Sequence, residues 1–145
     1  MRIERGDLWN ALGDADLLVV SINRTITRGG NLVMGAGAAR QAKCRFPMLP
    51  ALFGAQIADG VRDNLLLVQH GEQWFGGLVV KEHWSQPARL DLIESGVTAL
   101  AAYASAHPRH KIDMHYPGIG LGQLLRADVA PLLLSLPDNV TVWEL

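Results

Sequence analysis

The sequence has 145 residues, of which 49% are hydrophobic and 19% charged, and its formal net charge is -1. This length fits one globular domain over residues 1–145, and the composition excludes a disordered or fibrous chain. The charge excludes a general attraction for nucleic acid, so DNA or RNA would need a local basic patch. The single cysteine, Cys44, excludes an internal disulfide framework, and no metal-ligand spacing occurs. We therefore expect no metal, no cofactor and a reducing, cytoplasmic setting.

The N-terminal segment 1–7 carries charges where a signal peptide needs an apolar core. No later stretch approaches about 20 uninterrupted apolar residues, the length that a membrane-spanning helix needs. We expect neither secretion nor a membrane partner.

The first half of the chain predicts strands and small helices in alternation. A first strand precedes Gly6, and the apolar run 16–22 predicts a strand buried on both faces. Small residues at 34–43 predict a helix that opens out of a glycine-rich turn, and prolines then redirect the chain into a second short helix that ends near residue 59. Two apolar runs, 65–68 and 75–80, predict strands that could pair as a hairpin.

The second half predicts two further helices and two further strands. Apolar residues recur at spacings of three and four from residue 90 to residue 100, the pattern of an amphipathic helix. A strand at 111–116, a helix at 127–134 and a last strand at 139–144 follow. Strands that alternate with helices predict a three-layer α/β/α sandwich around a mixed, mainly parallel sheet.

Two glycine-rich loops follow predicted strands, and ligands of such sheets bind beyond the carboxyl ends of the strands. We call residues 29–37 the first glycine loop and residues 118–122 the second glycine loop. Glycines let backbone N–H groups approach an anion, and a helix that starts after the loop adds the positive end of its dipole. Two such loops suit a pyrophosphate, although tight turns between strand and helix explain the same spacing.

Three polar side chains near strand ends are candidates for chemistry, and each has a structural alternative. Asp7 could accept a hydrogen bond from an adenine amino group or cap the segment after it. Asn23 could bind a ribose hydroxyl or form a turn. Lys81, followed by Glu82-His83-Trp84, could act as a nucleophile on a sugar carbon or be a solvated residue at a strand end.

Taken together, these segments resemble the macro domain family, and within it the subgroup of lysine-dependent ADP-ribosyl hydrolases that includes antitoxins reversing DNA ADP-ribosylation. The resemblance covers nearly the whole chain. Its segments, in order, are Gly6-Asp7-Leu8, Val20-Ser21-Ile22-Asn23, Met34-Gly35-Ala36-Gly37-Ala38-Ala39 with Lys43 and Phe46-Pro47, Lys81-Glu82-His83-Trp84 with the helix that follows, and Pro117-Gly118-Ile119-Gly120-Leu121-Gly122.

The resemblance implies a role for each matching residue. Asp7 and Leu8 would lie at the adenine, Asn23 at the distal ribose, and Lys81 would be the catalytic lysine at the distal ribose carbon. In the first glycine loop, the residues implied at the pyrophosphate and the distal ribose side are Met34, Gly35, Ala36 and Gly37. In the second, the residues implied at the phosphates are Gly118, Ile119, Gly120, Leu121 and Gly122. The implied ligand is ADP-ribose or an ADP-ribosylated macromolecule.

The sequence also departs from the pattern of this subgroup. The segment 24–32 is longer than this subgroup leads us to expect, and the residues before Lys81 are apolar. Some relatives have an aspartate just after the second glycine loop, where this sequence has Gln123-Leu124-Leu125. Three functions stay open: an ADP-ribosyl glycohydrolase acting on a nucleic-acid base or a protein carboxylate, a module that binds ADP-ribose without turnover, and a domain of phage or mobile-element type with a protein-protein role. A nucleic-acid substrate would use a local basic rim of Arg24, Arg28, Lys43 and Arg45.

Overall fold

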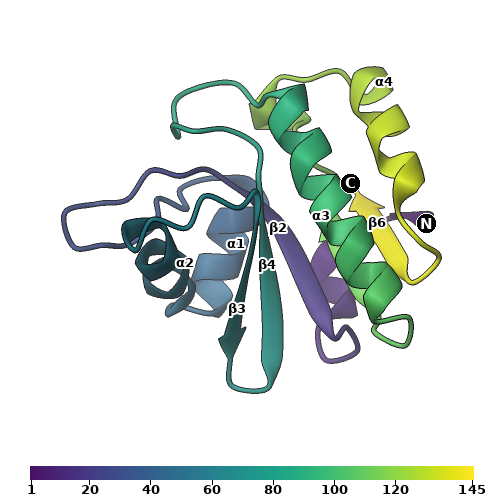
Figure 1. Cartoon of the computed structure of the whole chain (residues 1–145), viewed down its shortest axis with the longest axis horizontal. Helices are drawn as coiled ribbons and strands as arrows, with labels where there is room; N and C mark the ends of the chain where they lie inside the picture. Colours follow the sequence, from purple (N-terminus) through teal and green to yellow (C-terminus); the bar gives the residue numbers. More distant parts are fainter.

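A computed structural model describes residues 1–145, and its centre is a six-stranded sheet with the order β1-β6-β5-β2-β4-β3 (Figure 1). The strands are β1 (Arg2–Arg5), β2 (Leu17–Ile22), β3 (Leu65–His70), β4 (Gln73–Val79), β5 (Ile112–His115) and β6 (Val140–Glu144). All neighbouring strands pair in parallel except β3 and β4, which form an antiparallel hairpin. The predicted mixed, mainly parallel sheet and its hairpin are confirmed.

Helices cover both faces of the sheet, as Figure 1 shows. Helices α1 (Gly37–Arg45) and α2 (Leu49–Ala58) lie on one face, and α3 (Leu90–Ala106) and the short α4 (Arg126–Val129) lie on the other. A single-turn 3-10 helix, η1 (Leu8–Ala11), follows β1. The three-layer arrangement predicted from the alternation of strands and helices is therefore present.

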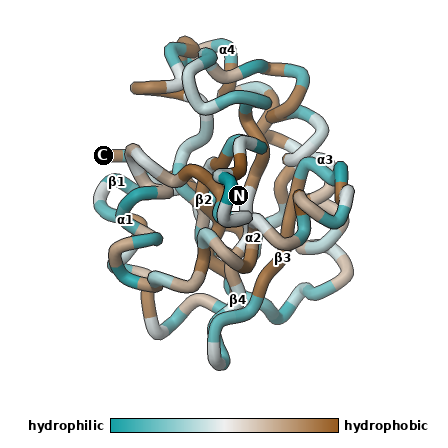
Figure 2. Tube along the Cα trace, turned by 90° about the vertical axis from the view of Figure 1, so that its left-hand side faces the viewer, coloured by the Kyte–Doolittle hydropathy of each residue, from teal (hydrophilic) through white to brown (hydrophobic).

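The sheet separates two hydrophobic cores, and β2 contributes to both. Leu18 and Val20 belong to the core beside α1 and α2, whereas Leu17 and Val19 belong to the core beside α3. Successive side chains of a strand point to opposite faces, so an apolar residue at every position is what burial on both faces requires. Figure 2 shows hydrophobic colour along the central strands and hydrophilic colour at the turn between β3 and β4.

The helix predicted at residues 127–134 is wrong in extent. Helix α4 ends at Val129, and a 3-10 helix, η3 (Ala130–Ser135), continues the chain. Pro131 explains the change, because proline has no N–H to donate to the carbonyl four residues earlier. The helix predicted from residue 34 likewise begins at Gly37, after an extended Ala36.

The long segment after β2 forms a small hairpin that packs on α2. Ile26 pairs with Leu32 as an antiparallel bridge, and the Leu32 N–H donates to the Pro50 carbonyl at 2.8 Å. The backbone of Gly30 lies so close to Gly54 in α2 that no side-chain carbon fits between them. The extra residues are thus held against a helix. No helix of the structure is both long and apolar enough to span a membrane.

Candidate functional site

A pocket of about 590 Å³ lies at the carboxyl ends of β2, β4 and β5. Both glycine loops contribute to its wall, and Asn23 and Lys81 line it together with them. The residues lining the pocket are Ser21, Ile22, Asn23, Val33, Met34, Gly35, Ala36, Gly37, Ala38, Ala39, Val80, Lys81, Trp84, His115, Tyr116, Gly118, Ile119, Gly120, Leu121 and Gly122. The structure therefore brings together nearly all of the residues singled out in the sequence, from segments up to about 100 positions apart.

The first glycine loop leads directly into α1. Gly37 has a φ of +58°, a left-handed conformation that favours glycine. The preceding Ala36 has no side chain that caps the helix, so the first N–H groups of α1 lack a capping partner where the helix adjoins the pocket. A free helix N-terminus attracts anions, because its N–H groups and its dipole both favour negative charge.

The second glycine loop has an equally restricted backbone. Gly118 and Gly120 have φ values of +78° and +67°. A Cβ at Gly118 would also come within 2.9 Å of a Leu124 methyl, whereas a Cβ at Gly120 would meet nothing within 4 Å. Gly118 is thus required by packing, and Gly120 leaves space beside the pocket open.

Lys81 lies two residues after the end of β4 and is half-buried in the pocket wall. It is the only lysine, arginine, aspartate or glutamate that lines the pocket. The neighbouring Glu82 does not supply a carboxylate there, because its Oε2 lies 3.4 Å from Arg24 Nε and 3.6 Å from Arg62 Nη2. The pocket therefore offers one amine and no carboxylate.

Asn23 is buried in the pocket wall, and its amide already holds the chain around the site. Its Nδ2 donates to the Val33 carbonyl at 3.0 Å, and its Oδ1 accepts from the Thr25 N–H at 2.8 Å. The turn-forming role is therefore present. Nδ2 carries a second hydrogen that remains for a ligand.

Asp7 and Leu8 do not line the pocket. Asp7 Oδ1 accepts from the Trp9 N–H at 3.0 Å and caps η1, while Leu8 is buried in the core. Asp7 nevertheless lies near the pocket, because its charge acts on His115, which lines it. The cap uses only one of the two carboxylate oxygens.

His115 and Ser21 are pocket residues that the sequence did not single out. His115 ends β5, and burial lowers the pKa of its imidazole, with the charge of Asp7 opposing the shift. Ser21 in β2 has a buried hydroxyl without a hydrogen-bond partner. A polar residue near the carboxyl end of a strand is the signal that could have identified each of them.

Trp84 and Leu121 expose apolar surface at the mouth of the pocket. The Trp84 side chain is 55% exposed, and Leu121 in the second glycine loop is 68% exposed. The Trp84 N–H donates to Thr25 Oγ1 at 3.1 Å, which ties this segment to the chain after β2. The indole is thus available to stack on a planar group.

The expected basic rim is wrong at Arg24. Its side chain is buried, and Nη2 donates to the Arg62 carbonyl at 2.9 Å and to Asn64 Oδ1. Burial lowers the pKa of the guanidinium, and Glu82 opposes the shift. Arg45 lies over the Trp9 ring at 5.1 Å and is exposed. No group of three or more His, Cys, Asp or Glu side chains is arranged to hold a metal ion.

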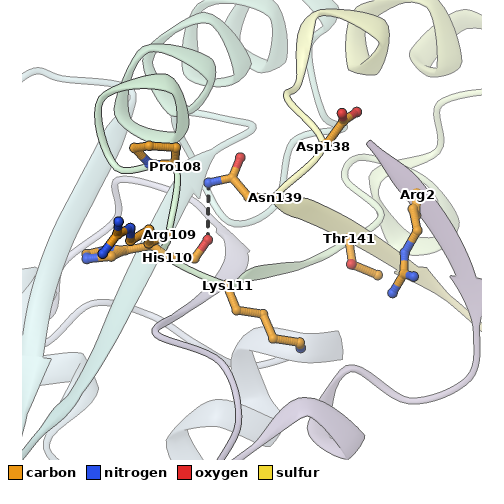
Figure 3. Close-up of a pocket in the computed structure, with 8 residues that line it drawn as sticks. All are labelled: Arg2, Pro108, Arg109, His110, Lys111, Asp138, Asn139 and Thr141. Carbon is orange, nitrogen blue, oxygen red and sulfur yellow. Dashed lines mark hydrogen bonds between the residues drawn. The ribbon is translucent and has the colours of Figure 1, made fainter.

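A second hollow, of about 290 Å³, lies at the opposite end of the sheet, where β1, β5 and β6 begin (Figure 3). Its cationic Lys111 is already paired with the buried Asp113 at 2.6 Å and with Asp14 at 3.5 Å. The Asn139 amide donates to the His110 carbonyl, as the dashed line shows. These polar groups are engaged with one another, so the larger pocket is the candidate site.

Comparison with known proteins identifies the fold. No protein-family model matches the chain, and no curated protein matches it in sequence. Among solved structures, the macrodomain of Thermus aquaticus DarG is 26% identical with a TM-score of 0.78, over 98% of this chain and 95% of that one. The macrodomain of Mycobacterium tuberculosis DarG is 24% identical with a TM-score of 0.79, over 99% and 97% of the two chains.

A third similar structure is Thermosipho africanus DarTG in complex with ADP-ribose. It is 23% identical with a TM-score of 0.79, and the match covers 98% of this chain but 41% of the Thermosipho chain. The fold of this chain is therefore that of the macrodomains, as the sequence motifs indicate.

Proposed function

We propose that this chain, which has the macrodomain fold, binds ADP-ribose along the carboxyl edge of its sheet and cleaves an ADP-ribosyl bond with Lys81. The observation that carries the proposal is the single pocket built by both glycine loops, Asn23 and Lys81. The likeness to a Thermosipho protein in complex with ADP-ribose supports the choice of ligand.

The strand order favours an extended ligand with distinct ends. Asp7 follows β1, His115 ends β5, Asn23 follows β2 and Lys81 follows β4, and this is also their order across the sheet. Neighbouring strands lie roughly 5 Å apart, so Asp7 and Lys81 are separated by about 20 Å along the edge. A dinucleotide-like ligand would place its base near Asp7 and His115 and its distal ribose near Lys81.

The pyrophosphate would lie between the two glycine loops. The free N-terminus of α1 begins at Gly37 on one side, and the backbone of Gly118 to Gly122 lies on the other. Since no carboxylate lines the pocket, nothing there repels two phosphate groups. Backbone N–H groups would bind most of the charge.

Hydrolysis would proceed at the anomeric carbon of the distal ribose. The neutral Lys81 amine attacks this carbon, and a C–N bond forms while the modified base or carboxylate leaves with the electrons of the broken bond. The proton that the lysine nitrogen loses passes to the leaving group. Water then displaces the lysine, so the net reaction adds one water across the ADP-ribosyl bond. The glycine loops contribute by fixing the ribose in front of Lys81.

Calorimetric titration with ADP-ribose, with AMP and NAD as controls, tests binding, and Lys81→Ala tests the chemistry. We expect micromolar, selective binding that Lys81→Ala changes by a few-fold at most, with loss of turnover on ADP-ribosylated DNA or protein, because the lysine acts mainly in the transition state. Unchanged turnover in Lys81→Ala would refute the catalytic assignment. Absence of ADP-ribose binding by the parent protein would refute the ligand.

Gly120→Phe tests the placement of the phosphates. A Cβ at Gly120 meets open space, so a large side chain there should block the ligand while the domain stays folded. The left-handed φ of +67° should lower the stability of this variant by about 1–2 kcal/mol, which thermal unfolding would measure. Retained affinity in this variant would mean that the phosphates lie elsewhere.

Binding without turnover is the second candidate function. The absence of any carboxylate from the pocket favours it, because Lys81 then has no acidic partner for proton transfer. Binding that is unaffected by Lys81→Ala, together with no turnover by the parent protein, would select this function.

Nucleic acid remains a proposed substrate through the exposed part of the basic rim. With Arg24 buried, the rim is reduced to Arg28, Lys43 and Arg45. Neutralising these three should weaken the binding of ADP-ribosylated DNA more than that of free ADP-ribose, whereas equal losses of affinity would remove nucleic acid from the proposal.

Cys44 is exposed and forms no disulfide, which suits the reducing cytoplasm where we place the protein.

A further inference from the structure

Arg24 is a buried cation that joins three segments of the chain. Only 4% of its side chain is exposed. Nη2 donates to the Arg62 carbonyl and to Asn64 in the segment before β3, and the guanidinium faces the Glu82 carboxylate beyond β4. The other charged groups acting on it are Arg62 and Asp63. Arg24 itself directly follows Asn23, which lines the pocket.

The backbone beside Arg24 continues the pairing of β2 and β4 beyond the sheet. The Val80 N–H donates to the Ile22 carbonyl at 2.9 Å, and the Arg24 N–H donates to the Glu82 carbonyl at 3.1 Å. Lys81 lies between these two hydrogen bonds. Its backbone position is therefore fixed by the same segment that carries the buried guanidinium.

Stability alone does not account for this arrangement. Arg24 Nη1 is buried without a hydrogen-bond acceptor, and Nε faces only the Glu82 carboxylate at 3.4 Å, without a hydrogen bond of good geometry. An unsatisfied buried donor is unfavourable. The Glu82 side chain that faces the guanidinium is 37% exposed, and an ion pair with a solvent-exposed member contributes little to stability. A buried arginine at this place therefore indicates that the guanidinium fixes the geometry of the segments that it joins.

We propose that Arg24 is a positioning residue that holds the segment after β4 through Glu82 and thereby directs the Lys81 amine into the pocket. The catalytic part of this inference rests on the proposed function of Lys81. The geometric part does not, because the position of a lysine can be measured without ligand.

The surroundings of the Lys81 amine can be followed directly by NMR, because the chain has only three lysines, Lys43, Lys81 and Lys111. Reductive methylation with ¹³C-formaldehyde gives resolved NMR signals for three side chains and the N-terminal amine, and Lys81→Arg assigns the signal of interest. Arg24→Met replaces the guanidinium by an apolar chain, and Arg62→Met is the matched control, because it removes an exposed cation near the same Glu82 carboxylate.

We expect Arg24→Met to shift the Lys81 signal while those of Lys43 and Lys111 stay unchanged, and Arg62→Met to shift none. The melting temperature of Arg24→Met should fall only moderately, because the Arg62 carbonyl and Asn64 lose one donor. An unchanged Lys81 signal in Arg24→Met would overturn the proposal. Movement of all three signals together with a large loss of stability would overturn it as well, since Arg24 would then be structural. If Arg24→Met does not fold, Glu82→Gln decides, because it removes only the charge that Arg24 faces and should shift the Lys81 signal alone.

Kinetics add the functional consequence. In an active parent protein, Arg24→Met should lower kcat by about 10- to 100-fold with KM and ADP-ribose affinity nearly unchanged, because a small misplacement of a reacting group has this effect. A parallel loss of kcat and affinity would contradict positioning. Absence of turnover in the parent protein would instead refute the hydrolase proposal and leave the NMR result to decide the role of Arg24.

Discussion

The substitution Gly54→Ala separates helix propensity from packing, because the two predict opposite signs. Gly54 lies inside α2, where alanine is intrinsically better than glycine by about 0.5–1 kcal/mol. A Cβ at Gly54, however, would overlap the Gly30 carbonyl oxygen, and it would lie 2.9 Å from the carbonyl carbon and 3.0 Å from the Leu32 nitrogen. These are backbone atoms, which cannot rotate away, so the hairpin after β2 must move off α2.

The expected net effect of Gly54→Ala is a loss of stability. Overpacking of this kind costs about 1–3 kcal/mol, and separation of the Leu32 N–H from the Pro50 carbonyl adds roughly 1 kcal/mol. After the propensity gain, we expect a net loss of about 1–3 kcal/mol, or roughly 3–10 °C in melting temperature for a domain of this size.

Urea unfolding followed by circular dichroism would measure this loss, and Gly29→Ala is the matched control in the same hairpin. A Cβ at Gly29 meets its neighbours at 3.6 and 3.8 Å, which are ordinary contacts, so this variant should be neutral or slightly more stable. A Gly54→Ala protein that is as stable as the parent protein, or more so, would refute the close packing of the hairpin on α2.

Three further substitutions test separate features. Gln123→Gly should stabilise the domain by roughly 0.5–1 kcal/mol in urea unfolding, because Gln123 is the only non-glycine residue with a left-handed φ, at 65°, and a loss of stability would contradict that conformation. Burial lowers the pKa of His115 below its ordinary value of 6.5, so the unfolded chain binds the proton more readily and stability falls as the pH drops from about 6.5 through the lowered pKa of the folded state. His115→Gln should flatten this part of the stability profile, and an unchanged slope would show that His115 is not its source. Asn139→Ala should cost about 1–2 kcal/mol by thermal unfolding, because the amide donates to three backbone carbonyls at 3.0–3.1 Å, and a neutral result would mean that water replaces it fully.

The sequence predicts those parts of the fold that depend on local patterning. The apolar run of β2 and the spacing of Leu90, Ile93, Val97 and Leu100 each have one physical solution, burial on both faces and an amphipathic helix, and the structure has both. The prediction of a helix over residues 127–134 followed the apolar residues and neglected Pro131. Because proline has no backbone N–H to donate, α4 ends at Val129 and a 3-10 helix follows.

The parts that the sequence could not predict depend on contacts between distant segments. Arg24 follows a strand in a polar segment, where an arginine is usually solvated, and its partner Glu82 is 58 positions away in the chain. The approach of Asp7 to His115 depends likewise on the strand order, which places the end of β1 two strands from β5. The pocket could be predicted from two glycine loops at strand ends, whereas the use of each polar side chain needed the tertiary structure.

The near absence of charged side chains from the pocket has a consequence for how ligand affinity responds to ionic strength. Lys81 is the only lysine, arginine, aspartate or glutamate in the wall, so a bound pyrophosphate would be held chiefly by backbone dipoles in partly buried surroundings. Dissolved ions screen exposed charges far more than buried dipoles. The affinity for free ADP-ribose should therefore stay nearly constant between low and physiological salt, while a macromolecular substrate attracted by Arg28, Lys43 and Arg45 outside the pocket would lose affinity as salt is added.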